Sequence, residues 1–173
     1  MERIEKTIEV DCPVRTVYNQ WTQFEDFPKF MAGVKEVRQL DDTHLHWRAE
    51  VWGKDKEWDS EITEQEPDER ISWRSLGGAT TAGTVRFEPL DEDRTLVRLV
   101  MSYEPEGVIE NIGDAIGALS SQVEASVEDF KHFIEARSSE TGAWRGEVSD
   151  GEPRRSSQSR QTESDEQDED DRS

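Results

Sequence analysis

Hydrophobic and polar residues alternate with a period of two through much of the first 104 residues. Residues 3–10, for example, place isoleucine and valine on one face and glutamate and threonine on the other. This alternation is typical of a half-buried strand. It returns in six further stretches after residue 33, separated by short turns such as 66–69. Short turns between alternating strands predict an antiparallel sheet with one dry face and one wet face.

Two regions have helical spacing instead. Apolar side chains in residues 14–21 share one helical face, and Pro28 disfavours helix at the residue before it, so a second short helix or turn is expected at 24–31. Apolar residues then step by four or three along 108–137, which predicts one amphipathic helix about 45 Å long. The order β-α-α-β6-α predicts an α+β fold with helices on one side of an antiparallel sheet.

Composition indicates that the C-terminal end of the chain differs from the folded part. Hydrophobic residues make up 32% of the chain and charged residues 36%, a balance typical of partial disorder. Beyond Trp144 and Val148, residues 138–173 contain nothing to bury, and they end in the acidic run ESDEQDEDD. We therefore predict a folded domain over 1–137 and a disordered, solvating acidic tail over 138–173. Trp144 is the one residue that keeps a docking role open for the tail.

The formal net charge is −20. Residues 138–173 hold 5 basic and 11 acidic residues, which leaves 16 and 30 in residues 1–137, a net charge of −14. This charge argues against binding to nucleic acid or to anionic membranes. No apolar run long enough for a transmembrane segment and no signal peptide are expected. The single cysteine, Cys12, excludes an internal disulfide, and a cytoplasmic location is expected.

Three parts of the chain resemble a known superfamily. They are VDCPVRTVYNQWTQFEDFPKFMAGVKEVRQL at 10–40, the strand run ending GTVRFEPLDEDRTLVRLVMSYEP, and the long terminal helix. Together they resemble the START-like, or Bet v 1-like (SRPBCC), superfamily, and most closely its polyketide cyclase/dehydrase and coenzyme Q-binding START-type group. The resemblance covers about residues 1–137 and implies a helix-grip fold, a curved antiparallel sheet gripping a long C-terminal helix. The superfamily includes lipid carriers, quinone binders and polyketide aromatases, so it implies no single function.

The predicted dry faces contain the candidate site. Trp47, Trp58 and Trp73 lie on them and would either form an aromatic cavity wall or fill a large core. Ser60 and Ser75 share these faces and favour a ligand-lining role, because hydroxyl groups can orient a ligand. The expected cavity lining is Phe27, Phe30, Trp47, Trp58, Ser60, Trp73, Ser75, Val85, Phe87, Met101, Tyr103, Ile112 and Ile116, with the first two at an entrance. Core packing is the alternative for the phenylalanines of the 21–31 stretch.

Other candidate residues give weaker evidence for a functional site. Gly113 and Gly117 lie four apart in the long helix and indicate either a thin cavity wall or, as we favour, close approach of helix to sheet. His44 and His46 form an H-x-H pair on a wet face without a third ligand, so no metal site is expected. Cys12 has no histidine at a recognisable spacing and is interpreted as a small buried residue.

No catalytic set is evident. Acid–base chemistry would need a carboxylate, histidine or lysine inside the cavity, and the dry faces offer only Lys56 near a rim. No nucleotide loop, nucleophile elbow or HExxH motif occurs, and no cofactor is expected. The predicted function is binding or carriage of a hydrophobic small molecule, whether lipid, quinone or polyketide-like. The alternatives are a polyketide cyclase or dehydratase and a non-catalytic interaction module with a filled cavity.

Overall fold

The computed structural model describes residues 2–31, 33–51, 54–77, 80–104 and 112–154. In chain order the elements are β1 (Glu2–Val10), α1 (Val14–Trp21), the 3-10 helix η1 (Phe24–Lys29), β2 (Val34–Gln39), β3 (His44–Val51), β4 (Lys54–Glu66), β5 (Arg70–Leu76), β6 (Thr80–Asp91), β7 (Arg94–Glu104), α2 (Ile112–Arg137), β8 (Glu147–Ser149) and β9 (Glu152–Arg154). The predicted order of the first ten elements is confirmed. Two short strands, β8 and β9, follow where none was expected.

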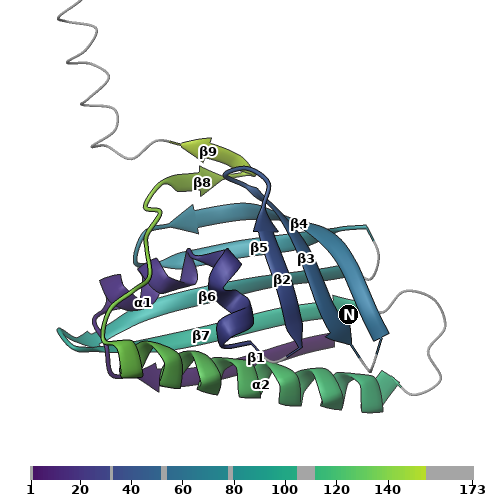
Figure 1. Ribbon diagram of the computed structural model, residues 1–173, viewed down its shortest axis with the longest axis horizontal. Helices are drawn as coiled ribbons and strands as arrows, with labels where there is room; N and C mark the ends of the chain where they lie inside the picture. The colour runs from purple at the N-terminus through teal and green to yellow at the C-terminus, as the bar shows by residue number, and fades with distance from the viewer. Residues whose placement is uncertain (1, 32, 52–53, 78–79, 105–111, 155–173) are drawn as a thin grey trace, which may run out of the picture.

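The strands form one curved, unclosed antiparallel sheet in the order β1-β7-β6-β5-β4-β3-β2. Helix α2 runs along one face of this sheet, and α1 and η1 lie over the same side (Figure 1). This arrangement confirms the predicted helix-grip α+β fold. It leaves an inner face, covered by helices, and an outer face that carries exposed charged side chains of the strands such as Arg86 and Glu88.

Alternation along each strand decides which side chains face inward. On β6, Gly83, Val85 and Phe87 are buried, whereas Arg86 and Glu88 between and after them are exposed. Successive side chains of a strand point to opposite faces, so the hydrophobic pattern fixes the register against the helices. The dry faces predicted from the sequence are therefore confirmed on this strand.

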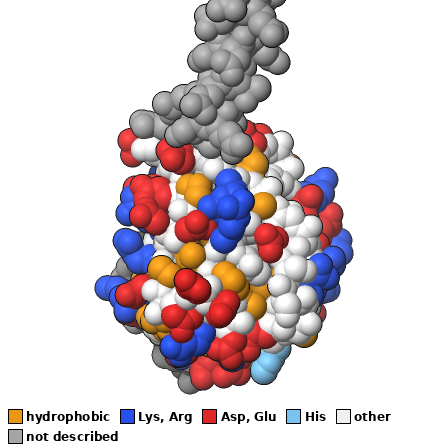
Figure 2. Space-filling model, turned by 90° about the vertical axis from the view of Figure 1, so that its left-hand side faces the viewer, with side chains coloured by type: hydrophobic (Ala, Val, Ile, Leu, Met, Phe, Trp, Pro, Cys, Tyr) orange, Lys and Arg blue, Asp and Glu red, His pale blue; other side chains and the backbone are white. Residues whose placement is uncertain are grey.

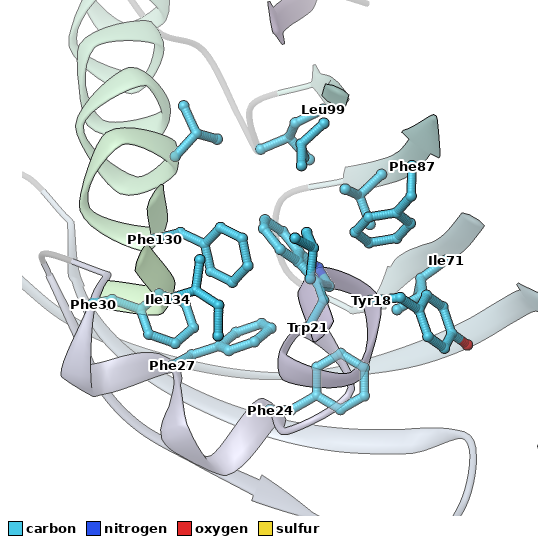
Figure 3. Close-up of a cluster of buried hydrophobic side chains, with 14 of the residues drawn as sticks. Tyr18, Trp21, Phe24, Phe27, Phe30, Ile71, Phe87, Leu99, Phe130 and Ile134 are labelled. Carbon is cyan, nitrogen blue, oxygen red and sulfur yellow. The ribbon is translucent and has the colours of Figure 1, made fainter. Parts of the chain in front are cut away.

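Aromatic side chains fill one end of the space between sheet and helices (Figure 3). Trp21 meets Phe130, Phe27 and Phe87 edge to face, with ring centroids 4.8, 5.8 and 6.2 Å apart. Phe30 meets Phe130 in the same manner at 5.3 Å. Edge-to-face contacts are a favoured arrangement of aromatic rings. The aromatic residues of the 21–31 stretch thus form a core, which we call the filled end.

Residues 138–154, here called the strap, fold back against the domain. Trp144 packs against the core, Val148 is buried, and β8 pairs with β4. Strand β3 pairs with β4 only as far as Glu61, so β8 covers part of the β4 edge that β3 leaves free. Residues 138–154 therefore pack against the domain beyond the predicted boundary at residue 137, and residues 155–173 lie outside the described part of the chain.

Buried polar residues of α1 explain why the strap binds there. Gln20 is fully buried; its Nε2 donates to Thr141 Oγ1 at 3.1 Å, and its Oε1 accepts from the Thr141 backbone N–H at 2.9 Å. The hydroxyl of Thr22, also buried, accepts from the Trp144 backbone N–H at 3.1 Å. Buried polar groups need partners, and here the strap supplies them. The sequence signal that was missed is the polar run NQWTQ at residues 19–23, where α1 ends.

Replacing Gln20 by Ala is expected to lower the free energy of unfolding by about 1–3 kcal/mol, because both strap hydrogen bonds are lost and a buried N–H is left unpaired. Urea unfolding followed by circular dichroism measures the change. Gln39→Ala, an exposed glutamine at the end of β2, is the matched control and should stay within about 0.5 kcal/mol of the parent. Equal effects of the two substitutions would show that the Gln20 contacts contribute nothing.

Asp26 makes the strap sensitive to acid. Burial raises the pKa of Asp26, but hydrogen bonds from Thr141 Oγ1 at 2.6 Å and Lys29 Nζ at 3.0 Å outweigh it and leave the pKa below its ordinary value. A carboxyl group with a lowered folded-state pKa contributes stability above its unfolded pKa of about 4. That contribution is lost as the pH falls through the folded-state pKa.

Stability is therefore expected to decline below about pH 4, and to decline less steeply in Asp26→Asn. Thermal unfolding at a series of pH values measures the slope, with Asp42→Asn, an exposed residue of the β2–β3 turn, as control. An unchanged slope in Asp26→Asn, or the same change in both variants, would contradict the assignment.

Candidate functional site

The inner face is less completely covered at its other end. Trp47, Trp58, Trp73, Met101 and Tyr103 point inward from β3, β4, β5 and β7 and are half-buried. We call this set the tryptophan end. Large aromatic and apolar side chains that stay partly uncovered in a group mark a surface for another molecule more often than single exposed ones do. This end is therefore the candidate site.

Trp47 and Trp58 form a stacked pair. They are cross-strand partners on β3 and β4, and their rings are parallel to within 1° with centroids 6.0 Å apart. Trp47 Nε1–H donates to the buried Ser60 Oγ at 2.8 Å. The Ser60 hydroxyl thus satisfies an indole N–H and keeps its own O–H as a donor, so its ligand-orienting role stays a prediction. The pair presents a flat aromatic surface.

A glycine lets Trp73 lie close to the sheet. Trp73 of β5 is the cross-strand partner of Gly83 of β6. A Cβ atom added at Gly83 would lie 2.6 Å from Trp73 Cε2, closer than real Cβ contacts allow. Glycine inside a strand often marks such a close approach. The Gly83–Trp73 pairing therefore fixes the position of one wall of the tryptophan end.

Hydroxyl groups form a row beside these indoles. Ser60 pairs with Ser75 across β4 and β5, Thr81 pairs with Tyr103 across β6 and β7, and the Thr81 N–H donates to Ser75 Oγ at 2.9 Å. Burial raises the pKa of Tyr103 above its ordinary value, so its hydroxyl is neutral at physiological pH. A neutral phenol can donate and accept a hydrogen bond. Thr81 was not among the predicted lining residues, and it lies near the start of β6.

The structure places four predicted lining residues elsewhere. Phe27, Phe30 and Phe87 are buried among the aromatic side chains of the filled end (Figure 3), and Val85 is buried in the same core. Phe30 also lines the concavity between η1 and α2, so its expected place at an entrance stays a prediction. Phe27 lies 5.9 Å from Trp47, ring centroid to centroid, so the filled end and the tryptophan end meet at this contact. The alternation predicted the correct face of the sheet for Val85 and Phe87. It could not predict at which end of the inner face they lie.

Residues of the long helix α2 say less about the candidate site. Ile112 and Ile116 belong to the first turns of α2, and their side chains lie outside the described part of the structure. The same holds for Gly113. A Cβ atom added at Gly117 would have no atom within 4 Å, so close approach of helix to sheet does not require this glycine. The favoured interpretation of Gly117 is therefore wrong.

The histidine and cysteine side chains considered as metal ligands or nucleophiles lie outside the tryptophan end. His46 faces outward, with Nδ1 2.7 Å from Asp59 Oδ1, and no cluster of three or more His, Cys, Asp or Glu in the described residues could hold a metal ion. Cys12 is buried beside the Ile134 carbonyl, and burial raises the pKa of its thiol, which disfavours the reactive thiolate. In the described ranges no helix combines the length and apolar character needed to cross a bilayer.

Two concavities of the surface also lie elsewhere. A groove of about 480 Å³ runs between η1 and α2 and includes Met31 and Phe133. A depression of about 330 Å³ on the outer face of the sheet includes Arg86 and Arg98. Neither is lined by a residue of the tryptophan end.

Comparison with known proteins agrees with this fold. The sequence profile of the family described as polyketide cyclase / dehydrase and lipid transport matches residues 10–132. An uncharacterised 17.2 kDa protein of Streptomyces lincolnensis is 52% identical over 149 residues, which are 86% of this chain and 99% of the relative. The chain therefore belongs to the polyketide cyclase/dehydrase and lipid transport family.

Solved structures support the fold alone, because their identities are low. The Zhui aromatase/cyclase from Streptomyces sp. R1128 is 18% identical, with a TM-score of 0.69 over 83% of this chain and 99% of its own. A START superfamily protein from Mycobacterium smegmatis is 16% identical, with a TM-score of 0.64 over 78% of this chain and 95% of its own.

Gly83→Val is expected to push the Trp73 indole away from β6 and to lower the free energy of unfolding by about 1–3 kcal/mol, the usual cost of overpacking. Near-ultraviolet circular dichroism and urea unfolding measure the two effects. The control is Gly77→Ala, in a turn where an added Cβ would meet no atom within 4 Å but φ is +86°. This control should destabilise through backbone strain and leave the near-ultraviolet spectrum unchanged. An unchanged spectrum in Gly83→Val would contradict the proposed Trp73 packing.

Proposed function

We propose that this protein binds a hydrophobic small molecule at the tryptophan end of its inner face. The observation that carries the proposal is the half-buried set of Trp47, Trp58, Trp73 and Met101 beside a filled end that needs no ligand. A ligand at this position would cover apolar surface that the protein leaves in contact with water. Membership of a family named for polyketide cyclases, dehydrases and lipid transport supports a ligand of this class.

The packing limits where the ligand lies. Phe27 and the aromatic cluster behind it occupy the filled end, so the ligand stays between the sheet and the first half of α2. The parallel rings of Trp47 and Trp58 favour a flat ligand that can lie against an indole. Each Å² of apolar surface removed from water contributes about 25 cal/mol before the costs of association. Carriage or sequestration needs nothing more than this burial.

A second candidate is a polyketide cyclase or dehydratase, and one observation favours it. The hydroxyls of Tyr103 and Ser75 line the inner face beside the tryptophans, where they could orient a reacting carbonyl group. Acid–base catalysis would also need a group that exchanges protons near neutral pH. Tyr103 with its raised pKa is poorly suited to act as that base. Binding is therefore the primary proposal.

The first experiment identifies the natural ligand and its position. Native mass spectrometry of the protein purified from its own host, followed by organic extraction, should show a bound apolar molecule. In parallel, titration with 1-aminoanthracene, a neutral aromatic probe, should give an affinity about tenfold lower in Trp58→Leu, a loss of about 1.4 kcal/mol. Trp144→Leu, which changes a half-buried tryptophan of the strap, should leave the probe affinity unchanged.

The outcomes separate the candidates. Equal affinities in both variants would place the probe outside the tryptophan end and contradict the proposal. A protein without bound ligand that also fails to bind the probe would favour the interaction-module alternative. Chemical change of an extracted ligand on incubation with the protein would favour the enzyme.

A further inference from the structure

Three arginines lie side by side on the outer face of the sheet. Arg70 of β5 is the cross-strand partner of Arg86 of β6, which is in turn the partner of Arg98 of β7. We call these residues the arginine row. Like charges placed directly opposite one another destabilise a sheet. Such a row is unexpected in a chain with a net charge of −20.

The middle arginine is the least compensated. Arg70 pairs with Glu66 at 3.2 Å, and Arg98 Nε lies 3.6 Å from Glu5. Arg86 is exposed and has no ion pair within 4 Å among the described residues. All three arginines line the depression of about 330 Å³ on the outer face. The row thus offers guanidinium groups, with their fixed fork of N–H donors, in a concave site.

The last described residue, Arg154, lies in the same cross-strand row of backbone pairs as Arg70 and Arg86. Val148 of β8 pairs with Gln65 of β4, so Glu147 comes next to Glu66, and Glu66 pairs with Arg70. Glu147 also pairs with Arg154, the last described residue. Val148 is buried and Glu147 exposed, so Glu147 belongs to the outer face. Four strand spacings, about 19 Å, separate Arg154 from Arg86.

We propose that the acidic run at residues 163–171 of the same chain docks on the arginine row, with its carboxylates on Arg86 and Arg98. The run ESDEQDEDD contains seven acidic residues and no basic one. The eight residues 155–162 that precede it can span up to about 26 Å, which covers the distance from Arg154. Length and charge therefore match the site.

Charges on the rest of the domain disfavour binding of the acidic run at other surfaces, and carboxylates near the arginine row weaken its binding there. Residues 1–137 carry a net charge of −14, so the domain as a whole repels an acidic segment. On the face in Figure 2, acidic side chains are spread among the basic ones. Glu66, Glu69 and Glu88 also line the depression, so three carboxylates stand beside the three arginines and oppose docking. Exposed ion pairs contribute only about 0.2–1 kcal/mol each. The covalent connection compensates, because it raises the local concentration of the acidic run.

Paramagnetic relaxation in the full-length protein tests the proposal. A nitroxide label at Ser164→Cys reacts selectively, because Cys12 is buried. The label is expected to broaden the backbone amide signals of Arg86 and Arg98 at least several-fold more than those of the β2–β3 turn. The broadening should disappear in the double variant Arg86→Gln/Arg98→Gln and in about 0.5 M NaCl, where screening acts within a few ångströms. Arg48→Gln, an exposed arginine on β3, is the matched control and should leave it unchanged.

Two results would overturn the proposal. One is broadening that is uniform, lies on another surface, or persists in the double variant. The other is a site that takes a free anion instead: inorganic phosphate shifts the Arg86 signals while the label at residue 164 broadens none of them.

Discussion

The packing of Phe130 holds the domain together. Its ring lies edge-on to Trp21 of α1 at 4.8 Å and to Phe30 after η1 at 5.3 Å, so one side chain of α2 joins both short helices. Trp21 continues the contact to Phe87 on β6. Protein interiors are packed as densely as organic crystals, so this cluster fixes the C-terminal half of α2 against the sheet. The angle of the whole helix over the sheet depends on it.

That constraint divides the inner face into two ends with different roles. At the filled end the domain buries its own aromatic residues, and the strap closes the polar side of α1 through Gln20 and Thr22. At the tryptophan end, Trp58 and Trp73 remain half-buried. Gly83, which has no side chain, leaves room for the Trp73 indole to lie against β6. In the proposed function, stability and ligand binding would thus depend on different residues of one sheet. A ligand at the tryptophan end would complete a core that the filled end already anchors.

Local periodicity explains how much of this could be predicted from the sequence. Strand alternation identified the inner faces, because a side chain's face depends only on its neighbours along the strand. It could not tell Phe27 and Phe87, which fill the core, from Trp58, which does not, since depth along the groove depends on α2. The strap was missed for a similar reason. Gln20 and its partner Thr141 are 121 residues apart, and composition alone made residues 138–154 look unable to fold.

The most direct test of the two-ended inner face is fluorine NMR of protein labelled with 5-fluorotryptophan, assigned by Trp→Phe variants and titrated with 1-aminoanthracene. The account predicts that the signals of Trp47, Trp58 and Trp73 shift with a common saturation curve, while those of Trp21 in the filled end and Trp144 in the strap stay in place. A shift of Trp21 with Trp47, Trp58 and Trp73 unmoved would contradict it, and so would no shift of any tryptophan at saturating probe.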